Sequence, residues 1–150
     1  MLEIFIDADA CPVKQEVYRV AQRYGLHVTV VANSWMHIPN GNWIKLVVVE
    51  GQFEAADDWI VEHAAANDIV ISGDIPLAAR CLEKGTRVIG LRGDIFTQDS
   101  IGAALAARAL LAHLRELGTI TGGPAPFENR DRSSFLQRLD ETIRGIRRQG

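Results

Sequence analysis

Residues 2–12 read LEIFIDADACP, and this stretch joins an apolar strand to a pair of carboxylates. Residues 2–6 form a compact apolar run, which predicts a buried β-strand. Asp7 and Asp9 follow at its end, two positions apart. Pro12 fits the first turn of a helix, because its fixed backbone angle suits that position and no N–H is needed there. The stretch therefore predicts a strand, an acidic turn and a helix in succession.

The same alternation of strands and helices continues to the end of the chain. Apolar runs predict further strands at 27–32, 45–49, 68–72 and 87–91. Helical periodicity predicts helices at 12–24, 54–66, 75–84, 100–117 and 133–148. Apolar strands separated by helices are typical of a parallel sheet that is covered on both faces. The sequence therefore predicts an α/β fold with three layers, α/β/α, around a central, mostly parallel sheet of about five strands.

The length and composition are those of one globular domain. The 150 residues fit a single domain, 1–150, whose C-terminal helix from about 132 packs on it or extends from it. No apolar stretch reaches the roughly 18 residues of a membrane span, and no basic segment precedes the first apolar run as in a signal peptide. We therefore expect a cytoplasmic protein that does not associate with membranes. Cys11 and Cys81 lack CxxC spacing, so we expect buried or half-buried free thiols.

Acidic residues follow the predicted strands or begin the helix after one. Asp7 and Asp9 follow the first strand, and Asp74 follows the fourth. Asp57 and its neighbour Asp58 lie in the first turns of the helix after the third strand. Ligands collect at the carboxyl ends of parallel strands, which gives these acids a common place to meet. If the first and fourth strands are neighbours, their acids lie ~5 Å apart and repel one another unless they share a cation or some are protonated.

A shared divalent cation is the functional interpretation of this acidic set. Mg²⁺ and Mn²⁺ prefer carboxylate oxygens and use a substrate phosphate as a further ligand. In phosphodiester hydrolysis such ions activate water and stabilise the leaving oxygen. The candidate catalytic and metal-binding residues are therefore Asp7, Asp9, Asp57 and Asp74, with Mg²⁺ or Mn²⁺ as the cofactor.

Each acidic group also has a structural interpretation. An aspartate after a strand often caps the next helix, and this fits Asp74, which closely precedes a proline. If the segment is extended, the side chain of Asp9 points the same way as that of Asp7. If the next helix begins at Ala10, Asp9 instead caps that helix. Asp57 and Asp58 lie where the dipole of a helix favours acids.

Other motifs carry less specific signals. The four histidines have no zinc-ligand spacing, and neither GxGxxG nor a P-loop motif occurs. Trp35, Met36 and Trp43 flank an Asn/Pro/Gly loop, where they either stack a base or anchor the loop. The TGGPAPF stretch at 121–127 is either a substrate-facing turn or a linker. The net charge of −3 argues against a protein that coats nucleic acid, although six arginines between 130 and 150 form either a local basic face or a solvated helix surface.

Four motifs in order resemble the YaiI/YqxD family of uncharacterised bacterial proteins. They read IDADACPVK at 6–14, AADDWI at 55–60, SGDIPLA at 72–78 and TGGPAPFENRDRSSF at 121–135. That family is in turn similar to PIN-like domains, which are metal-dependent nucleases with a central parallel sheet. The resemblance implies a metal-dependent nuclease acting on RNA. It places Asp7, Asp57 and Asp74 at the acidic positions of PIN-like domains, with Asp94 or Asp99 as candidates for a further acid.

Two alternatives remain open beside a metal-dependent ribonuclease. The IFIDAD and IVISGD stretches are also similar to phosphatases of the haloacid-dehalogenase type, in which Asp7 would be the nucleophile and Asp9 the general acid/base. That family expects Thr or Val where this chain has Cys11. The other alternative is a non-catalytic module that binds RNA or a metal, with the arginine-rich last helix as its basic surface.

Overall fold

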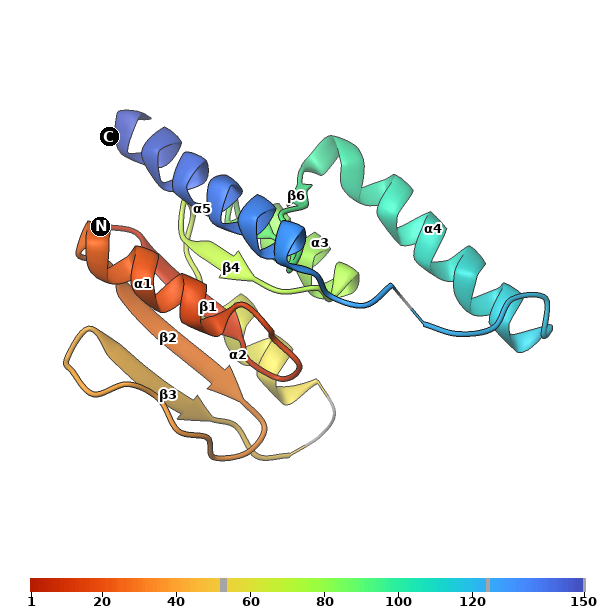
Figure 1. The fold of residues 1–150 in the computed structure, drawn as a ribbon, viewed down its shortest axis with the longest axis horizontal. Coiled ribbons are helices and arrows are strands. Elements are labelled where there is room, and N and C mark those ends of the chain that lie inside the picture. The colour runs from red at the N-terminus through yellow and green to blue at the C-terminus, as the bar shows by residue number, and fades with distance from the viewer. Residues whose placement is uncertain (52–53, 124, 150) are drawn as a thin grey trace.

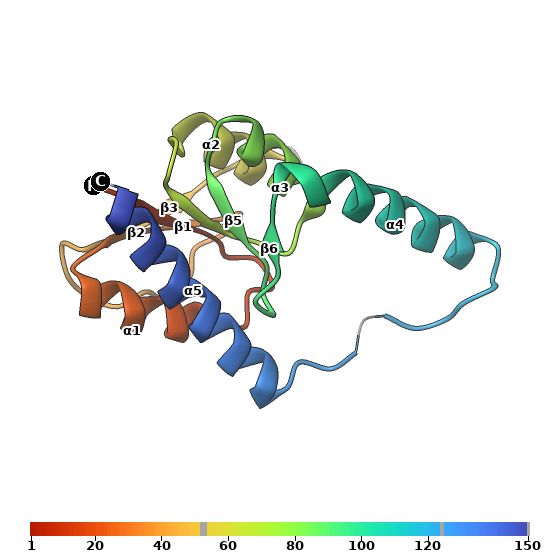
Figure 2. The same cartoon turned by 90° about the horizontal axis from the view of Figure 1, so that it is seen from above.

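The computed structural model describes residues 1–51, 54–123 and 125–149, and in it a central sheet lies between two layers of helices (Figures 1 and 2). Pro124 of the TGGPAPF stretch lies outside the described residues. The strands are β1 Glu3–Asp7, β2 His27–Ala32, β3 Ile44–Val48, β4 Ile69–Ile71, β5 Arg87–Ile89 and β6 Ile95–Phe96. The helices are α1 Lys14–Tyr24, α2 Ala55–His63, α3 Ile75–Glu83, α4 Gln98–Glu116 and α5 Asn129–Gln149. The predicted α/β class is confirmed.

The sheet has the strand order β3-β2-β1-β4-β5-β6. Neighbouring strands from β3 to β5 run parallel, and β6 pairs with β5 in the antiparallel direction. Strand β1 lies at the centre, between β2 and β4, and its Ile6 is opposite Ile71 of β4. The first and fourth strands are therefore neighbours, and the order of the strands reverses at β1, where a ligand crevice is expected.

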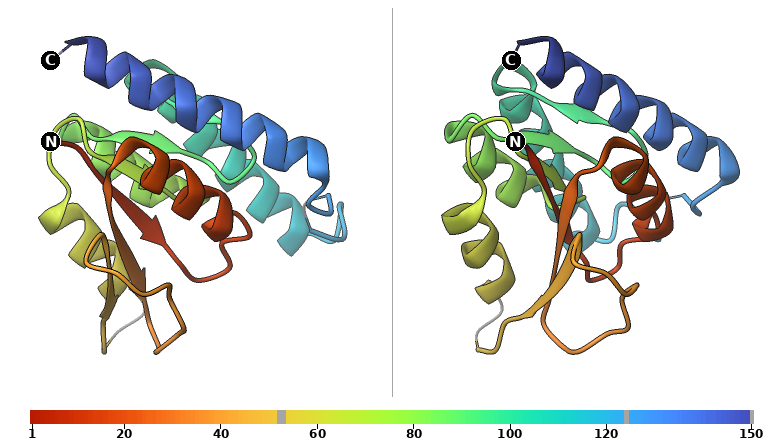
Figure 3. Two further views of the ribbon diagram at one scale, coloured as in Figure 1. Left: turned by 60° about the vertical axis from the view of Figure 1, so that its left-hand side comes forward. Right: turned by 90° about the vertical axis from the view of Figure 1, so that its left-hand side faces the viewer.

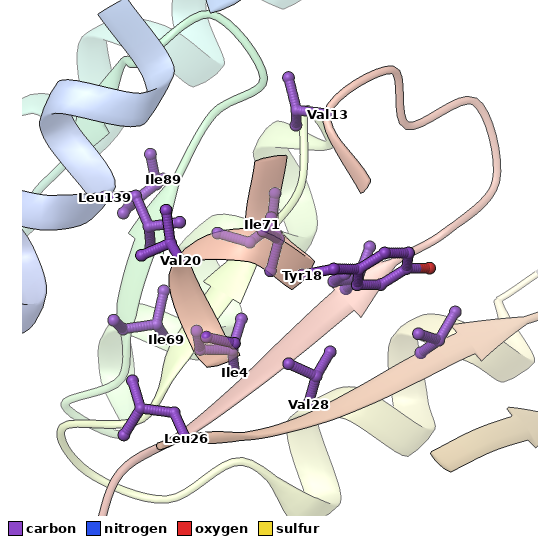
Figure 4. Packing of buried hydrophobic residues seen from close by; sticks show 14 of the residues in the cluster. Ile4, Val13, Tyr18, Val20, Leu26, Val28, Ile69, Ile71, Ile89 and Leu139 are labelled. Atoms are coloured by element: carbon purple, nitrogen blue, oxygen red, sulfur yellow. The ribbon is translucent and has the colours of Figure 1, made fainter. Parts of the chain in front are cut away.

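Each face of the sheet carries its own apolar core. Ile4 and Ile6 belong to the core under α1 and α5, whereas Phe5 between them belongs to the core under α2 and α3. This follows from the two-residue alternation of side chains along a strand. Figure 4 shows the first core, which contains Val20 of α1 and Leu139 of α5. Figure 3 shows α1 and α5 together on the side of the sheet away from α2.

The sheet contains six strands instead of about five. The additional strand, β6, has two residues and follows a turn in which Gly90 donates an N–H to the carbonyl of Asp94. A segment this short cannot show the alternation by which strands are recognised in a sequence. The other predicted boundaries agree with the structure to within four residues.

Helix α1 begins at Lys14 and not at Pro12 as predicted. Ala10 has a φ of 60°, in the left-handed region, and the N–H of Cys11 donates to the carbonyl of Ala8. The chain is therefore still turning at 8–11, so the proline precedes the helix. The N-cap of α1 is Val13, and Asp9 does not cap this helix.

Helix α4 has an unusual position, because it extends away from the sheet (Figure 2). It begins with a capping box in which Thr97 and Ser100 exchange hydrogen bonds. Ile101 in its first turns joins the core under α2 and α3, and it is the one buried residue of the helix. Across the part of the chain that the structure describes, no helix combines the length and apolar character needed to cross a membrane.

Candidate functional site

A cavity of about 400 Å³ opens where the carboxyl ends of β1, β2 and β4 meet the start of α2. Its walls include all four of the predicted carboxylates, which come from three separate segments of the chain: Asp7, Asp9, Asp57 and Asp74. The remaining lining residues are Ala10, Asn33, Ala56, Gly73 and Leu91. The structure therefore brings the predicted site residues to one place, beside the central strand of the sheet.

Asp7 is held by a serine on the neighbouring strand. Because Ile6 is opposite Ile71, the next residues, Asp7 and Ser72, also lie side by side. The Ser72 hydroxyl donates to Asp7 Oδ2 at 2.8 Å and accepts from the backbone N–H of Asp74 at 3.0 Å. The hydroxyl of Ser72 therefore links two acidic residues of the site, and Ser72 itself is buried.

Asp74 has two roles in the geometry. Its Oδ1 accepts the N–H of Leu77 at 3.1 Å, so it is the N-cap of α3, as the structural interpretation predicted. Pro76 follows within the first two helical positions. The same carboxylate lines the cavity. Capping therefore fixes the carboxylate at the edge of the site and does not remove it from the site.

Asp9 is oriented by the loop after β2. Its Oδ2 accepts the side-chain N–H of Asn33 at 2.8 Å and the backbone N–H of the same residue at 3.3 Å. Asn33 also lines the cavity, and sequence reasoning did not identify it. The available signal was its position directly after a strand that turns out to be the neighbour of β1. Two residues further on, Trp35 is 74% exposed, whereas Met36 and Trp43 pack against the core.

The two adjacent acids of α2 have different surroundings. Asp57 lines the cavity, whereas Asp58 forms an exposed ion pair with Arg80 at 2.9 Å. Their different directions follow from the 100° between successive residues of a helix. Asp58 therefore has a structural contact on the surface, whereas Asp57 faces the cavity.

The acids of the cavity repel one another. Burial, together with the charges of Asp74, Asp7 and Glu54, raises the pKa of Asp57 to about 6, against a smaller opposing effect of Arg80. Burial also raises the pKa of Asp7, against the opposing effect of the Ser72 hydrogen bond, and Asp74 and Asp9 add to the rise. The site therefore holds negative charge that its own hydrogen bonds do not fully compensate.

These residues fit a hard divalent cation by chemistry. Asp7, Asp9 and Asp74 each use one carboxylate oxygen in the hydrogen bonds above, and the second oxygen takes part in none of them. Oxygen donors of this kind suit Mg²⁺ and Mn²⁺. Within the described ranges, no group of three or more His, Cys, Asp or Glu side chains is already arranged to hold a metal ion. Binding would therefore require these carboxylates to turn toward one another.

Other candidates from the sequence lie outside this site. Among the residues that the structure describes, the cavity lining includes neither Asp94 nor Asp99. Cys11 and Cys81 are free and buried, as predicted. Burial raises the pKa of both thiols, that of Cys81 to about 11, so neither is a thiolate nucleophile at neutral pH.

Several arginines of α5 are engaged with the protein itself. Arg144 pairs with Asp140 at 3.0 Å, and Arg147 donates to the carbonyl of Tyr24 at 2.6 Å. The first contact lies within α5 and the second ties the end of α5 to the end of α1, which favours the interpretation of this face as a solvated helix surface.

Comparisons with known proteins show a consistent set of relatives. A family model described as "Uncharacterized BCR, YaiI/YqxD family" matches residues 5–145. The chain is 55% identical to a UPF0178 protein of Rhodospirillum centenum, with 99% of each chain covered. It is 52% identical to a UPF0178 protein of Rhodospirillum rubrum, covering 98% of this chain and 99% of the relative. A UPF0178 protein of Brucella suis is 53% identical, with 98% and 92% covered. No solved structure matches the chain.

Proposed function

The chain belongs to the YaiI/YqxD family, and from this premise we propose that it is a divalent-metal-dependent nuclease that hydrolyses phosphodiester bonds in RNA. The family description assigns no activity, so the proposal rests on the site itself. The observation that carries it is the convergence of Asp7, Asp9, Asp57 and Asp74 on one cavity, with a raised pKa at Asp57 and Asp7.

Such a cluster is costly without a cation. Carboxylates that share a site destabilise the fold through repulsion and lost hydration. The fold nevertheless holds three of them in place by hydrogen bonds from Ser72, Asn33 and Leu77. Mg²⁺ or Mn²⁺ bound to these oxygens would activate water and stabilise the leaving oxygen of a phosphodiester. The protein's own part is to bring the carboxylates to one cavity, where they would turn toward the cation.

RNA is the proposed substrate for two reasons. The family motifs are similar to those of PIN-like nucleases, and Trp35 presents an exposed ring close in sequence to Asn33 of the cavity wall. An exposed aromatic ring stacks on an unpaired base without regard to its identity. Single-stranded RNA is therefore the substrate with which the proposal is best tested.

The experiment measures cleavage of a fluorescent single-stranded RNA with Mn²⁺ or Mg²⁺. The Asp57→Asn variant is expected to lose activity by about 100-fold or more, because it removes a ligand of the cation. Asp58→Asn is the matched control, since it makes the same change one residue away on the exposed ion pair with Arg80, and it should retain activity. Asp74→Asn should also be inactive but folded, because asparagine is an equally good helix cap.

Three outcomes would contradict the proposal. Cleavage that continues in EDTA or in the Asp57→Asn variant would indicate a contaminating nuclease. Absence of Mn²⁺ binding in calorimetry would remove the metal site altogether. Turnover of a small phosphomonoester, with a phosphoryl mimic trapped on Asp7, would instead support the phosphatase alternative.

A further inference from the structure

The exposed surface of helix α4 is the feature of the fold that the acidic site does not explain. The helix spans Gln98–Glu116, and alanine, leucine, isoleucine and glycine dominate its sequence. A helix with apolar residues around most of its circumference is normally buried. Here a single residue, Ile101, is buried, and Leu105, Leu110 and Leu111 are among the exposed large apolar residues of the protein.

One face of α4 has the pattern of a helix–helix seam. Positions 103, 107, 110, 114 and 117 are spaced by four and three residues in turn, as in a coiled coil, and all are alanine or leucine. With the adjacent residues on the same side, this seam face consists of Ala103, Ala104, Ala107, Leu110, Leu111 and Leu114. The charged residues of α4 lie on its flanks or on the opposite side: Asp99, Arg108, Arg115 and Glu116. Ile101 points about 120° away from Ala107, so the contact with the core leaves most of the seam face exposed, with Ala104 and Leu114 half-buried.

The size of the exposed surface indicates a partner. The chain exposes 8725 Å², whereas a compact protein of 16.5 kDa exposes about 7,600 Å². The excess, on the order of 1,100 Å², exceeds the roughly 800 Å² that each partner contributes to a standard stable interface. Helix α4 contributes to this excess, because it touches the rest of the protein mainly near its beginning, where Gln98 donates to the carbonyl of Leu82. Residues 117–123 and 125–128 after it are also mostly exposed and contribute as well.

The seam face is complementary to itself in one orientation. Its first half carries small residues, Ala103 and Ala104, and its second half carries large ones, Leu110 and Leu111. In an antiparallel pair centred on Ala107, the small half of one helix meets the large half of the other. Large side chains opposite small ones fill the space between helices efficiently. A parallel pair would place leucine against leucine at one end and leave a gap between alanines at the other.

From this pattern we propose that the protein is a homodimer held by two antiparallel α4 helices that meet through their seam faces. Ala107 lies at the two-fold axis, with Ala103 beside Leu111 of the second copy and Ala104 beside Leu110 of the second copy. The helix dipoles are antiparallel in this arrangement, which is also favourable. The interface is isologous and closed, so assembly ends at two subunits.

The test is the mass of the purified full chain in solution, measured by sedimentation equilibrium at micromolar concentration. The wild type should have twice the monomer mass of 16.5 kDa. Ala107→Glu should shift the protein to monomer, with dimerisation weakened by at least about 100-fold, because two carboxylates would be buried together at the axis. Ala112→Glu is the matched control, since it changes an equally exposed alanine on the other side of the same helix and should leave the dimer intact. Circular dichroism establishes that both variants are folded.

Cross-linking tests the orientation independently. A mixture of Ala103→Cys and Leu111→Cys proteins should form a disulfide-linked heterodimer, whereas Ala103→Cys alone should remain mostly uncrosslinked. The native thiols, Cys11 and Cys81, are buried and do not interfere. A monomeric wild type at about 100 μM, or a dimer that survives Ala107→Glu, would overturn the proposal. Efficient cross-linking of Ala103→Cys to itself would overturn the antiparallel arrangement. None of these measurements depends on nuclease activity.

Discussion

At Asp57 the acidic site has a direct consequence for stability. The pKa in the folded protein is about 6, above the ordinary 3.8, so the folded state binds this proton more tightly than the unfolded state. Proton binding at Asp57 therefore adds to the free energy of unfolding. This contribution is largest at low pH, falls as the pH rises between about 4 and 6, and is lost above that range. In the metal-free protein at neutral pH, the ionised Asp57 destabilises the fold.

Asp57→Asn should therefore raise the Tm of the metal-free protein at pH 7.5 by on the order of 3 °C, and should change it little at pH 4.5. Thermal unfolding in EDTA at several pH values measures this. Asp58→Asn is the control, because Asp58 is paired with Arg80 on the surface and should shift the Tm by less than about 1 °C. A lower Tm for Asp57→Asn at pH 7.5 would contradict the electrostatic interpretation of the cavity.

The backbone conformation of Ala10 also destabilises the fold. Its φ of 60° places it in the left-handed region, which costs a residue with a Cβ roughly 1 kcal/mol more than glycine. Ala10→Gly should therefore stabilise the protein by about 0.5 kcal/mol in urea unfolding, after the greater flexibility of glycine in the unfolded chain is included. The same substitution at Ala79, inside α3, should destabilise it by about 1 kcal/mol. A loss of stability at both positions would show that the Ala10 conformation carries no strain.

Trp35 provides a test of the substrate class that rests on the proposed function. If its ring stacks on an unpaired base, Trp35→Ala should raise the KM for single-stranded RNA by about 10-fold with little change in kcat. Trp35→Phe retains an aromatic face and should restore most of the affinity. The ring is 74% exposed, so neither change should lower the Tm. An unchanged KM in Trp35→Ala would exclude this residue from substrate binding.

At the scale of elements, the junction between β4 and α3 contains a residue, Asp74, that has both a structural role and a place in the acidic site. Asp74 caps α3 and lines the cavity, and Ser72 connects it to Asp7. Asp74→Ala should lower the free energy of unfolding by about 1 kcal/mol relative to Asp74→Asn, because alanine cannot accept the N–H of Leu77. Urea unfolding of the two variants measures the difference. Equal stabilities would show that the cap contributes little.

The boundaries of the elements were predictable where a local signal marks them. Gly25, at the C-terminus of α1, has a φ of 67°, and glycine adopts this left-handed conformation without steric cost. The beginning of the same helix was predicted two residues early, because the proline signal at Pro12 did not reveal the preceding turn at Ala10. A left-handed alanine has no signature in the sequence, since the conformation is imposed by the contacts around it.

At the scale of the whole molecule, α5 completes the layer that begins with α1. Its Phe135, Leu139 and Ile143 are fully buried against the sheet. Leu139→Ala should therefore cost about 2–5 kcal/mol of unfolding free energy, through lost burial and the cavity that remains. Leu105→Ala, on the projecting helix and 37% exposed, should cost less than about 1 kcal/mol. Chemical denaturation compares the two, and similar costs would show that α5 is only loosely attached.

The alternation of strands and helices and the four candidate acids were predictable from the sequence without the structure. These are local properties: the period of apolar residues distinguishes a strand from a helix, and the acids stand at the ends of those periods. The tertiary structure alone decided that β1 lies between β2 and β4, which aligns Asp7 with Ser72 and Asp9 with Asn33. It also decided which of two adjacent aspartates of α2 enters the cavity, and that α4 leaves the core. The strand order, the rotation of α2 about its axis and the exposure of α4 depend on contacts between residues far apart in the chain. Local periodicity does not predict such contacts.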